Sequence, residues 1–240
     1  IDAATSGDTI NVAAGTYDEQ VVIDKSLTLQ GAGANVTTIQ APGTLTQTSW
    51  MHRGTTFQTL IEVNGADAHG ISVDISGFTI DGLNKYSANP RYTGIVYHNA
   101  DGTVSNNTIT KFGSAPVAGE DGWGVWVVEG CDVIISGNTI DEWGKGGIVV
   151  DGNDTDLADS NVNAAITDNT ITGAGNIATS AQNGIQISRG ATGTVTENAI
   201  SNIGFTPTTY SAAGILVYKT DNVTVADNTL TSTETGVYVQ

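Results

Sequence analysis

The sequence has few charged residues, and very few of these are basic. Only 14% of its 240 residues are charged, and 25 acidic residues stand against 8 lysines and arginines, which gives a net charge of −17. Nucleic acid and anionic membrane surfaces repel such a chain. There is one cysteine, Cys131, which excludes an internal disulfide, and no apolar run of 18 residues that could span a membrane.

What the sequence does contain is periodic. Apolar residues make up 39% of it and recur regularly, which is typical of a folded β-rich protein and not of a disordered one. A short motif, an asparagine followed two residues later by a large aliphatic residue, occurs five times. Its asparagines are spaced by 31, 31, 29 and 30 residues: Asn107, Asn138, Asn169, Asn198 and Asn228. A repeat of this length indicates stacked supersecondary units.

Each repeat contains three short strands. A β-branched residue precedes each asparagine by three positions, and a glycine-led alternating strand follows after a loop of variable length. The alternation directs Ile95 and Tyr97 inward and Val96 outward. A coil cannot bury its own inner face, so the coils must stack, about 4.8 Å apart. Asparagines aligned at one bend then form a side-chain amide ladder, and Cys131, on the inward phase, becomes a buried, unreactive thiol.

Two segments carry a resemblance to a known family. Residues 15–23 (GTYDEQVVI) and 27–33 (LTLQGAG) resemble the opening of pectate-lyase-like and pectin-methylesterase-like right-handed parallel β-helices, and the Asn-x-Ile coils resemble repeats of carbohydrate-binding proteins and sugar hydrolases. The resemblance implies an all-β, single-stranded right-handed parallel β-helix of about eight coils with three short strands each and an asparagine ladder. This fold hosts many activities.

The same resemblance sets the expected organisation and location. We expect residues 1–240 to form one monomeric β-helix domain that binds or processes a polysaccharide or another glycan and that is extracellular, at the cell surface or periplasmic. Both ends of the sequence look cut, so we expect a piece of a longer polypeptide.

Aromatic residues concentrate on the glycine-led strands and their flanking loops. Exposed aromatic rings in a groove stack on sugar rings, while polar groups at the rim bond the hydroxyls. The alternative is that the loops fold back and these rings only pack on the solenoid. The expected substrate-binding residues are Trp123, Trp126, Trp143, Tyr218, Tyr92 and Arg91.

Two enzymatic chemistries are open. In the pectate lyases that the chain resembles, calcium neutralises the substrate carboxylate and a basic side chain removes the adjacent proton; here Arg189 and Lys219, on adjacent coils near Asp151, fit such a role. Alternatively, carboxylates on neighbouring coils, among them Asp121, Glu129 and Asp151, could lie about 5 to 9 Å apart, as in glycoside hydrolases. His98, which faces outward from the glycine-led strands in the same column as Asp151, is a further candidate catalytic residue.

Calcium has its own candidate loop. Asp151, Asn153, Asp154 and Asp156 place hard oxygen ligands around Gly152, as calcium requires, although the terminal glutamate of an EF-hand is missing and such residues are also ordinary in loops. The sequence therefore leaves two functions open. One is a polysaccharide lyase or glycoside hydrolase; the other is a non-catalytic stalk, adhesin or binding domain of a larger surface protein.

Overall fold

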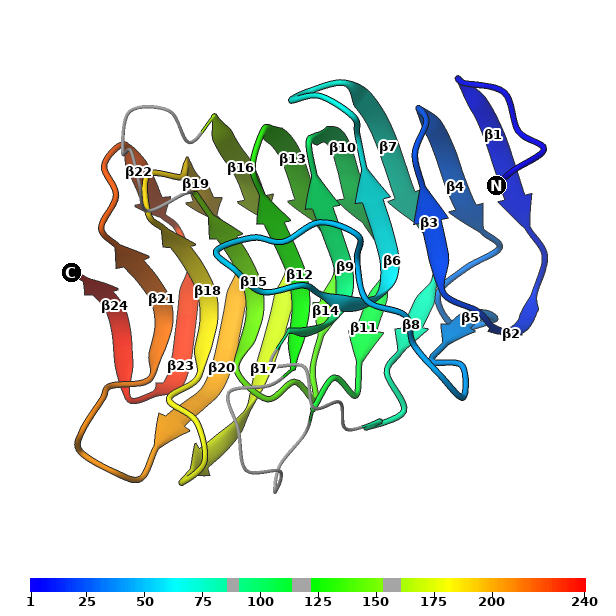
Figure 1. Ribbon diagram of the computed structural model, residues 1–240. Helices are drawn as coiled ribbons and strands as arrows, with labels where there is room; N and C mark the ends of the chain where they lie inside the picture. Colours follow the sequence, from blue (N-terminus) through cyan, green and yellow to red (C-terminus); the bar gives the residue numbers. More distant parts are fainter. Residues whose placement is uncertain (86–90, 114–121, 153–160) are drawn as a thin grey trace.

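The computed structural model describes residues 1–85, 91–113, 122–152 and 161–240. In these residues the chain forms 24 strands and no helix, and the strands make three parallel sheets of eight (Figure 1). The parts of the chain that the structure describes therefore hold no helix that could cross a membrane.

Each turn of the solenoid contributes one strand to each sheet. Sheet A contains β1 (Asp8–Val12), β4 (Leu27–Gly31), β7 (Ile71–Ser76), β10 (Ala100–Ser105), β13 (Cys131–Ser136), β16 (Val162–Thr167), β19 (Thr192–Thr196) and β22 (Val223–Ala226). Sheet B contains β2 (Gly15–Asp18), β5 (Thr37–Gln40), β8 (Thr79–Asp81), β11 (Thr108–Thr110), β14 (Thr139–Ile140), β17 (Thr170–Ile177), β20 (Ala199–Phe205) and β23 (Thr229–Thr233). Sheet C contains β3 (Val21–Ile23), β6 (Gln58–Asn64), β9 (Tyr92–His98), β12 (Trp123–Val128), β15 (Gly146–Asp151), β18 (Asn183–Ser188), β21 (Ala213–Tyr218) and β24 (Thr235–Val239). The predicted eight coils of three strands are confirmed.

The side-chain alternation on sheet C is as predicted. Ile95 and Tyr97 belong to the core enclosed by the three sheets, whereas Val96 belongs to a second apolar cluster on the outer face. The register pairs Glu62 with Val96, then Trp126, Val149 and Gln186 in successive coils. Outward residues thus form columns parallel to the solenoid axis, which is how residues far apart in sequence become neighbours.

The asparagine ladder closes the bend between sheets A and B. Nδ2 of Asn107 donates to Oδ1 of Asn138 at 3.2 Å, and the same bond continues at 2.9 Å from Asn138 to Asn169, from Asn169 to Asn198 and from Asn198 to Asn228. Each Oδ1 also accepts the backbone N–H of the residue one coil earlier; Phe78, which takes the asparagine position in its coil, donates its N–H to Asn107 at 3.0 Å. Buried amides are therefore paired along the stack.

Glycines form another column, where sheet C begins. A Cβ on Gly147 would lie 2.6 Å from the carbonyl oxygen of Gly184, and one on Gly184 would lie 2.6 Å from that of Gly214. Real Cβ atoms do not approach backbone oxygens this closely, so the close coil-to-coil contact requires glycine. Elsewhere in the core, Cys131 is free and fully buried, as predicted, and burial raises the pKa of its thiol to about 12.

One long connection departs from the regular coils. Residues 41–57, which we call the strap, join β5 to β6 and cross in front of β9, β12 and β15 (Figure 1). The equivalent connection in the first coil, between β2 and β3, has only two residues. The backbone N–H of Thr46 donates to Gln20 Oε1 at 2.9 Å, which fixes the strap near its beginning. The strap thus covers the outer face of sheet C.

Candidate functional site

The tip of the strap is a tight turn that carries a histidine to sheet C. The backbones of His52 and Thr55 bond each other at 3.1 Å, and the two residues between them, Arg53 and Gly54, have φ values of 49° and 76°. Positive φ at both central positions is the geometry of a two-residue hairpin turn of type I′. This turn directs the His52 side chain into the protein, where none of it is exposed.

His52 lies between two carboxylates from neighbouring coils. Its Nδ1 is 2.7 Å from Oε1 of Glu129, which follows β12, and its Nε2 is 3.2 Å from Oδ2 of Asp151, the last residue of β15. A neutral imidazole has only one N–H to donate, whereas the protonated ring has two. Two carboxylate partners therefore favour the imidazolium form of His52.

Asp151 is the centre of the cluster and is 1% exposed. Its Oδ1 accepts from the Ser188 hydroxyl at 2.8 Å and lies 3.1 Å from Nη1 of Arg189, while its Oδ2 faces His52 and lies 3.6 Å from Nη1 of Arg53. A buried carboxylate needs such partners to stay ionised. Asp151 is thus saturated by groups of the protein itself.

The pKa shifts agree with this charge assignment. Burial alone would raise the pKa of Asp151, but the hydrogen bond from His52 and the charge of Arg189 outweigh it and lower the value. For His52, burial acts to lower the pKa, and the bonds to Asp151 and Glu129 raise it above its ordinary value of 6.5. The bonds to His52 and then His98 lower the pKa of Glu129 to about 2. Both carboxylates are therefore ionised at neutral pH, with a buried cation between them.

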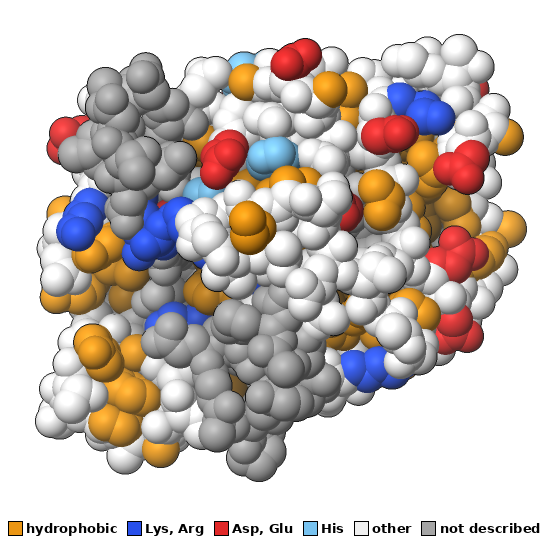
Figure 2. Space-filling view, viewed as in Figure 1, with side chains coloured by type: hydrophobic (Ala, Val, Ile, Leu, Met, Phe, Trp, Pro, Cys, Tyr) orange, Lys and Arg blue, Asp and Glu red, His pale blue; other side chains and the backbone are white. Residues whose placement is uncertain are grey.

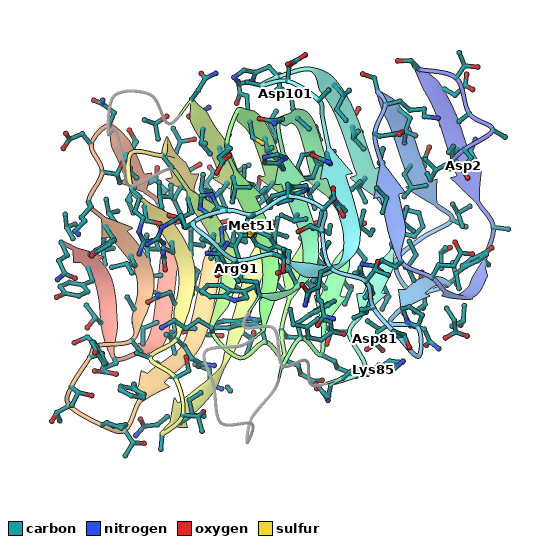
Figure 3. All side chains as sticks on the ribbon, in the orientation of Figure 1. Asp2, Met51, Asp81, Lys85, Arg91 and Asp101 are labelled. Carbon is teal, nitrogen blue, oxygen red and sulfur yellow. The ribbon has the colours of Figure 1, made fainter. Side chains whose placement is uncertain are left out.

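All three arginines of the chain meet here. Arg53 and Arg189 contact Asp151. Arg91 is close enough to these three residues for their charges to shift its pKa. The Arg91 guanidinium donates to the carbonyl oxygens of His52 and Thr55 at the strap tip, and burial lowers its pKa to about 10. Figure 3 labels Arg91 beside Met51 of the strap, over the middle strands of sheet C. The positive charges of the three arginines of this acidic protein are therefore concentrated around Asp151.

Two of the tryptophans expected to bind substrate lie beside the arginines, under the strap. Trp123 and Trp126 are 7% and 5% exposed, and Phe57 of the strap packs edge-on against Trp126 with ring centroids 5.0 Å apart. The Arg91 guanidinium lies 5.0 Å from the Trp126 ring centroid. The rings of Trp123 and Trp126 are therefore covered by a loop that packs back on the solenoid, which was the alternative to an open sugar-binding groove. Figure 2 shows this face, with histidine and acidic side chains side by side in its upper middle part and basic side chains to their left.

Two other expected substrate-binding residues belong to the core. Trp143 is completely buried, and Tyr92 is 1% exposed with its hydroxyl donating to the Gly82 carbonyl oxygen at 2.6 Å. The expectation that these rings face a groove is wrong. Trp143, in the loop before β15, and Tyr92, the first residue of β9, turn inward at the corner between sheets B and C, and their rings fill the space there.

His98 also lies beneath the strap. The indole of Trp50 stacks on its imidazole, with ring centroids 4.0 Å apart, and donates its N–H to Oε1 of Glu62 at 2.7 Å. The Nδ1 of His98 is 2.7 Å from Asn64, and its Nε2 is 3.6 Å from Glu129. Burial raises the pKa of Glu62, although the Trp50 bond partly offsets this. His98 therefore extends the cluster by one coil toward the N-terminus.

Charged residues follow three sheet C strands in the left-handed backbone conformation. Glu129, Arg189 and Lys219 come directly after β12, β18 and β21 and have φ values of 34°, 58° and 48°. This conformation recurs at other bends of the chain, for example at Lys111 and Glu197, so it marks a turn and is not by itself a sign of function. The conformation directs all three side chains to the same edge of sheet C.

The predicted partners Arg189 and Lys219 come together at Tyr218. The Arg189 guanidinium lies 5.1 Å, and the Lys219 ammonium 5.2 Å, from the Tyr218 ring centroid. Arg189 also reaches Asp151, as described above, whereas Lys219 is exposed. The expected proximity of Arg189, Lys219 and Asp151 therefore matches the geometry, and this end of the cluster is open to solvent.

The calcium site fits the described residues poorly. Asp151 has both oxygens engaged by cationic or hydroxyl groups, and Asn153, Asp154 and Asp156 lie outside the described residues, as does the candidate catalytic Asp121. No group of three or more His, Cys, Asp or Glu residues suited to a metal occurs in the described part of the chain. Calcium binding stays a prediction, and Asp151 is not suited to it.

Sequence reasoning did not assign His52 and Arg53 to the site. Both sit in the longest insertion of the described chain, next to Trp50, and an insertion rich in such side chains is the signal that could have identified them. Their partners were not predictable, since Asp151 lies 99 residues from His52.

Comparisons with known proteins agree with the architecture. The family model for the right-handed beta helix region matches residues 51–176 and 123–240. The alginate lyase from Paenibacillus sp. str. FPU-7 is structurally similar at 14% identity and a TM-score of 0.37, covering 98% of this chain and 94% of its own. The A-module of the mannuronan C-5 epimerase AlgE4 from Azotobacter vinelandii is similar at 14% identity and 0.30, covering 98% and 91%. Likenesses this weak carry nothing about activity, and no curated protein matches the sequence. Because the matched segments span more than half of the sequence, the chain belongs to the right-handed β-helix family.

Proposed function

We propose that the protein binds an acidic polysaccharide along the outer face of sheet C and that this face is its functional site. The observation that carries the proposal is the convergence of Arg53, Arg91 and Arg189 in a chain whose net charge is −17. A cationic spot on an otherwise acidic surface attracts an anionic polymer locally while the rest of the surface repels it, which selects where the polymer is held.

The open end of the cluster suits this ligand. Arg189 and Lys219 flank the half-buried Tyr218 and present two cations within reach of a sugar carboxylate. An arginine fork pairs with a carboxylate through two parallel hydrogen bonds, and aromatic edges pack on sugar rings. We place the protein outside the cytoplasm, where such polymers occur, as part of the same proposal.

Of the two reactions that the sequence left open, the charges favour β-elimination. Hydrolysis requires one carboxyl group that holds a proton to give to the leaving oxygen. Glu129, with a pKa of about 2, and the buried, ionised Asp151 do not supply one, and Glu62, whose pKa burial raises, lies beneath the strap with its Oε1 bonded by Trp50. Elimination instead requires a cation that neutralises the substrate carboxylate and a base that takes the adjacent proton. Arg189, held by Asp151, suits the first role, and the exposed Lys219 suits the second.

A second candidate is a non-catalytic binding or stalk domain. It is supported by the degree to which the cluster satisfies itself, because His52, Arg53 and Arg189 are all engaged by Asp151. In this case the cluster would fix the strap on the solenoid, and only its rim would meet a glycan.

One screen separates these possibilities. The protein is incubated with alginate, polygalacturonate and a neutral β-glucan, with calcium or with a chelator, and unsaturated product, reducing ends and bound polymer are measured. We expect binding of the two acidic polymers and, for an enzyme, ultraviolet-absorbing product. Binding without product would identify a binding domain, and absence of binding to either acidic polymer would refute the proposal. Loss of binding with the chelator would establish a calcium requirement.

A further inference from the structure

The strap covers the part of sheet C that carries outward-facing aromatic side chains. Trp126 belongs to the outer apolar cluster, together with Val96, Val128 and Val149, and the strap residue Phe57 seals it. Without the strap these side chains would form a contiguous apolar patch, and such patches mark binding surfaces. The strap therefore lies where the sequence alone would have put a sugar ring.

The strap is hydrogen-bonded within itself. Thr48 and Phe57 are joined by a backbone bond of 2.9 Å and by a bond of 3.0 Å from the Phe57 N–H to the Thr48 hydroxyl, and the backbones of His52 and Thr55 bond each other. Within the described residues, the backbone–backbone bonds of residues 48–57 are all internal to the strap. It can thus leave sheet C as a unit without breaking the strand ladder.

Side chains make the contacts that hold it down. His52 bonds Glu129 and Asp151, Trp50 bonds Glu62, and Arg91 donates to two carbonyl groups of the tip. One group beneath it is not satisfied: the indole N–H of Trp126 is buried and has no acceptor among the described residues. A buried donor without a partner is unfavourable and is satisfied when an acceptor arrives.

We propose that the strap is a displaceable cover, and that an acidic polysaccharide competes with it for the outer face of sheet C. This inference rests on the proposed function. In the uncovered state, a sugar ring packs on Trp126, a sugar oxygen accepts its indole N–H, and sugar carboxylates pair with Arg91. The closed state lowers the apparent affinity by the fraction of molecules that are open.

The test is hydrogen exchange of the intact protein with and without saturating alginate. Amides of Thr48, His52, Thr55 and Phe57 are bonded within the strap, and we expect these bonds to open more often once the side-chain contacts with sheet C are lost. We expect exchange of peptides from residues 44–57 to accelerate with alginate, while peptides from β13 and β16 stay unchanged. Unchanged or slower exchange in the strap, with alginate demonstrably bound, would overturn the cover and leave the proposed function intact.

A variant with a shortened strap provides a second test of the cover. Residues 42–56 are replaced by two residues, following the two-residue connection of the first coil. The shortened variant also lacks Arg53, so its affinity is compared with that of the full-length Arg53→Gln variant, and we expect it to bind alginate about tenfold more tightly. The matched control is Met51→Ala, because Met51 is on the strap and 62% exposed, and its affinity should equal that of the wild type. Folding of the shortened variant is checked by its circular dichroism. If it does not fold, Phe57→Ala, which removes one strap contact, takes its place with the same expected direction.

The outcomes separate the two proposals. Alginate binding by the wild type, with tighter binding by the shortened variant than by Arg53→Gln, supports both the site and the cover. Binding by a folded shortened variant that is equal to or weaker than that of Arg53→Gln refutes the cover alone. Absence of binding to any form refutes the proposed function, and the cover with it.

Discussion

Nε2 of His52 and Oδ2 of Asp151 lie 3.2 Å apart, although 99 residues separate them in the sequence. This contact joins the tip of the strap to the fifth coil and holds a buried cation against a buried anion. Because both groups have left water, each depends on the other, and removing one leaves an uncompensated charge. The stability of the fold therefore depends on both members of this pair being present.

Replacing Asp151 with asparagine should destabilise the protein strongly. The side chain is 1% exposed and faces His52, Arg53 and Arg189, so Asp151→Asn leaves these cations without their common anion. Loss of one partner of a buried ion pair costs about 3–5 kcal/mol. Urea unfolding measures the effect. Asp221→Asn, at an exposed position, is the control and should change the free energy of unfolding by less than about 0.5 kcal/mol. Equal effects would mean that the cluster does not act as a unit.

The stability of the protein should fall as the pH rises above neutrality. The folded-state pKa of His52 is raised above 6.5, so its contribution is complete below about pH 6.5 and is lost as pH increases through the folded pKa. Glu129, with a pKa lowered to about 2, acts in the opposite sense, and its contribution is lost as pH falls from about 4.5 toward 2. Stability should be highest between these limits.

Unfolding by urea from pH 5 to 9 checks the first limb. In His52→Gln the decline between pH 6.5 and 9 should largely disappear, whereas His69→Gln should remove little of it, because His69 and its partner Asp101 are about one third exposed. An unaltered decline in His52→Gln would assign the pH dependence to other groups.

The repeat was readable from the sequence because it has a local cause. Asn107 and its four equivalents recur every 29 to 31 residues, and a period-2 alternation places Ile95 inside and Val96 outside, so the strands, the coils and the ladder could be predicted. Column neighbours were predictable too, since a constant register aligns Trp126 with Val149.

The strap was not readable in this way. Residues 41–57 have no periodicity, and their path is set by side-chain contacts such as those of His52 with Glu129 and Asp151, which lie two and three coils away. The same limit explains Trp143: a loop residue turns inward or outward according to the space at its corner, and the local sequence does not specify that space. The sequence therefore predicted the sheet that carries the site and the edge on which Glu129, Arg189 and Lys219 lie. The other contacts of the site are known only from the structure.

Interrupting the asparagine ladder should be costly. Nδ2 of Asn169 donates to Ile135 O, Thr167 O and Asn198 Oδ1, and its Oδ1 accepts two bonds from Asn138. Asn169→Ala leaves several of these buried groups unpaired, at about 1–3 kcal/mol each, so a loss of more than about 3 kcal/mol is expected in thermal or urea unfolding. Asn163→Ala, on the exposed face of sheet A, should cost less than about 1 kcal/mol. Similar losses would show that the ladder adds no special stability.

A methyl group in the glycine column should also destabilise the stack. In Gly147→Ala the new Cβ would meet the Gly184 carbonyl oxygen at 2.6 Å and the Ile171 side chain at 2.8 Å. Both neighbours are fixed by the core, so the coils must separate locally, at about 1–3 kcal/mol. The control is Gly43→Ala, where the added Cβ meets nothing within 4 Å. A wild-type melting temperature in Gly147→Ala would mean that the coil spacing adjusts freely.

Removing the cations at Tyr218 should weaken the binding of acidic polysaccharide without unfolding the protein. Lys219 is exposed, and Lys219→Gln keeps the length of the side chain while deleting its charge. Losing one charge contact at a solvent-exposed rim should weaken alginate binding by a factor of about 3 to 10, and the loss should shrink as salt screens the interaction. Arg189→Gln should weaken binding further, but it also removes a partner of Asp151, so its unfolding free energy is measured alongside. Lys25→Gln, in the first coil, is the matched control and should bind as the wild type does. If Lys219→Gln and Lys25→Gln bind alginate equally at low salt, the glycan does not contact this end of the cluster.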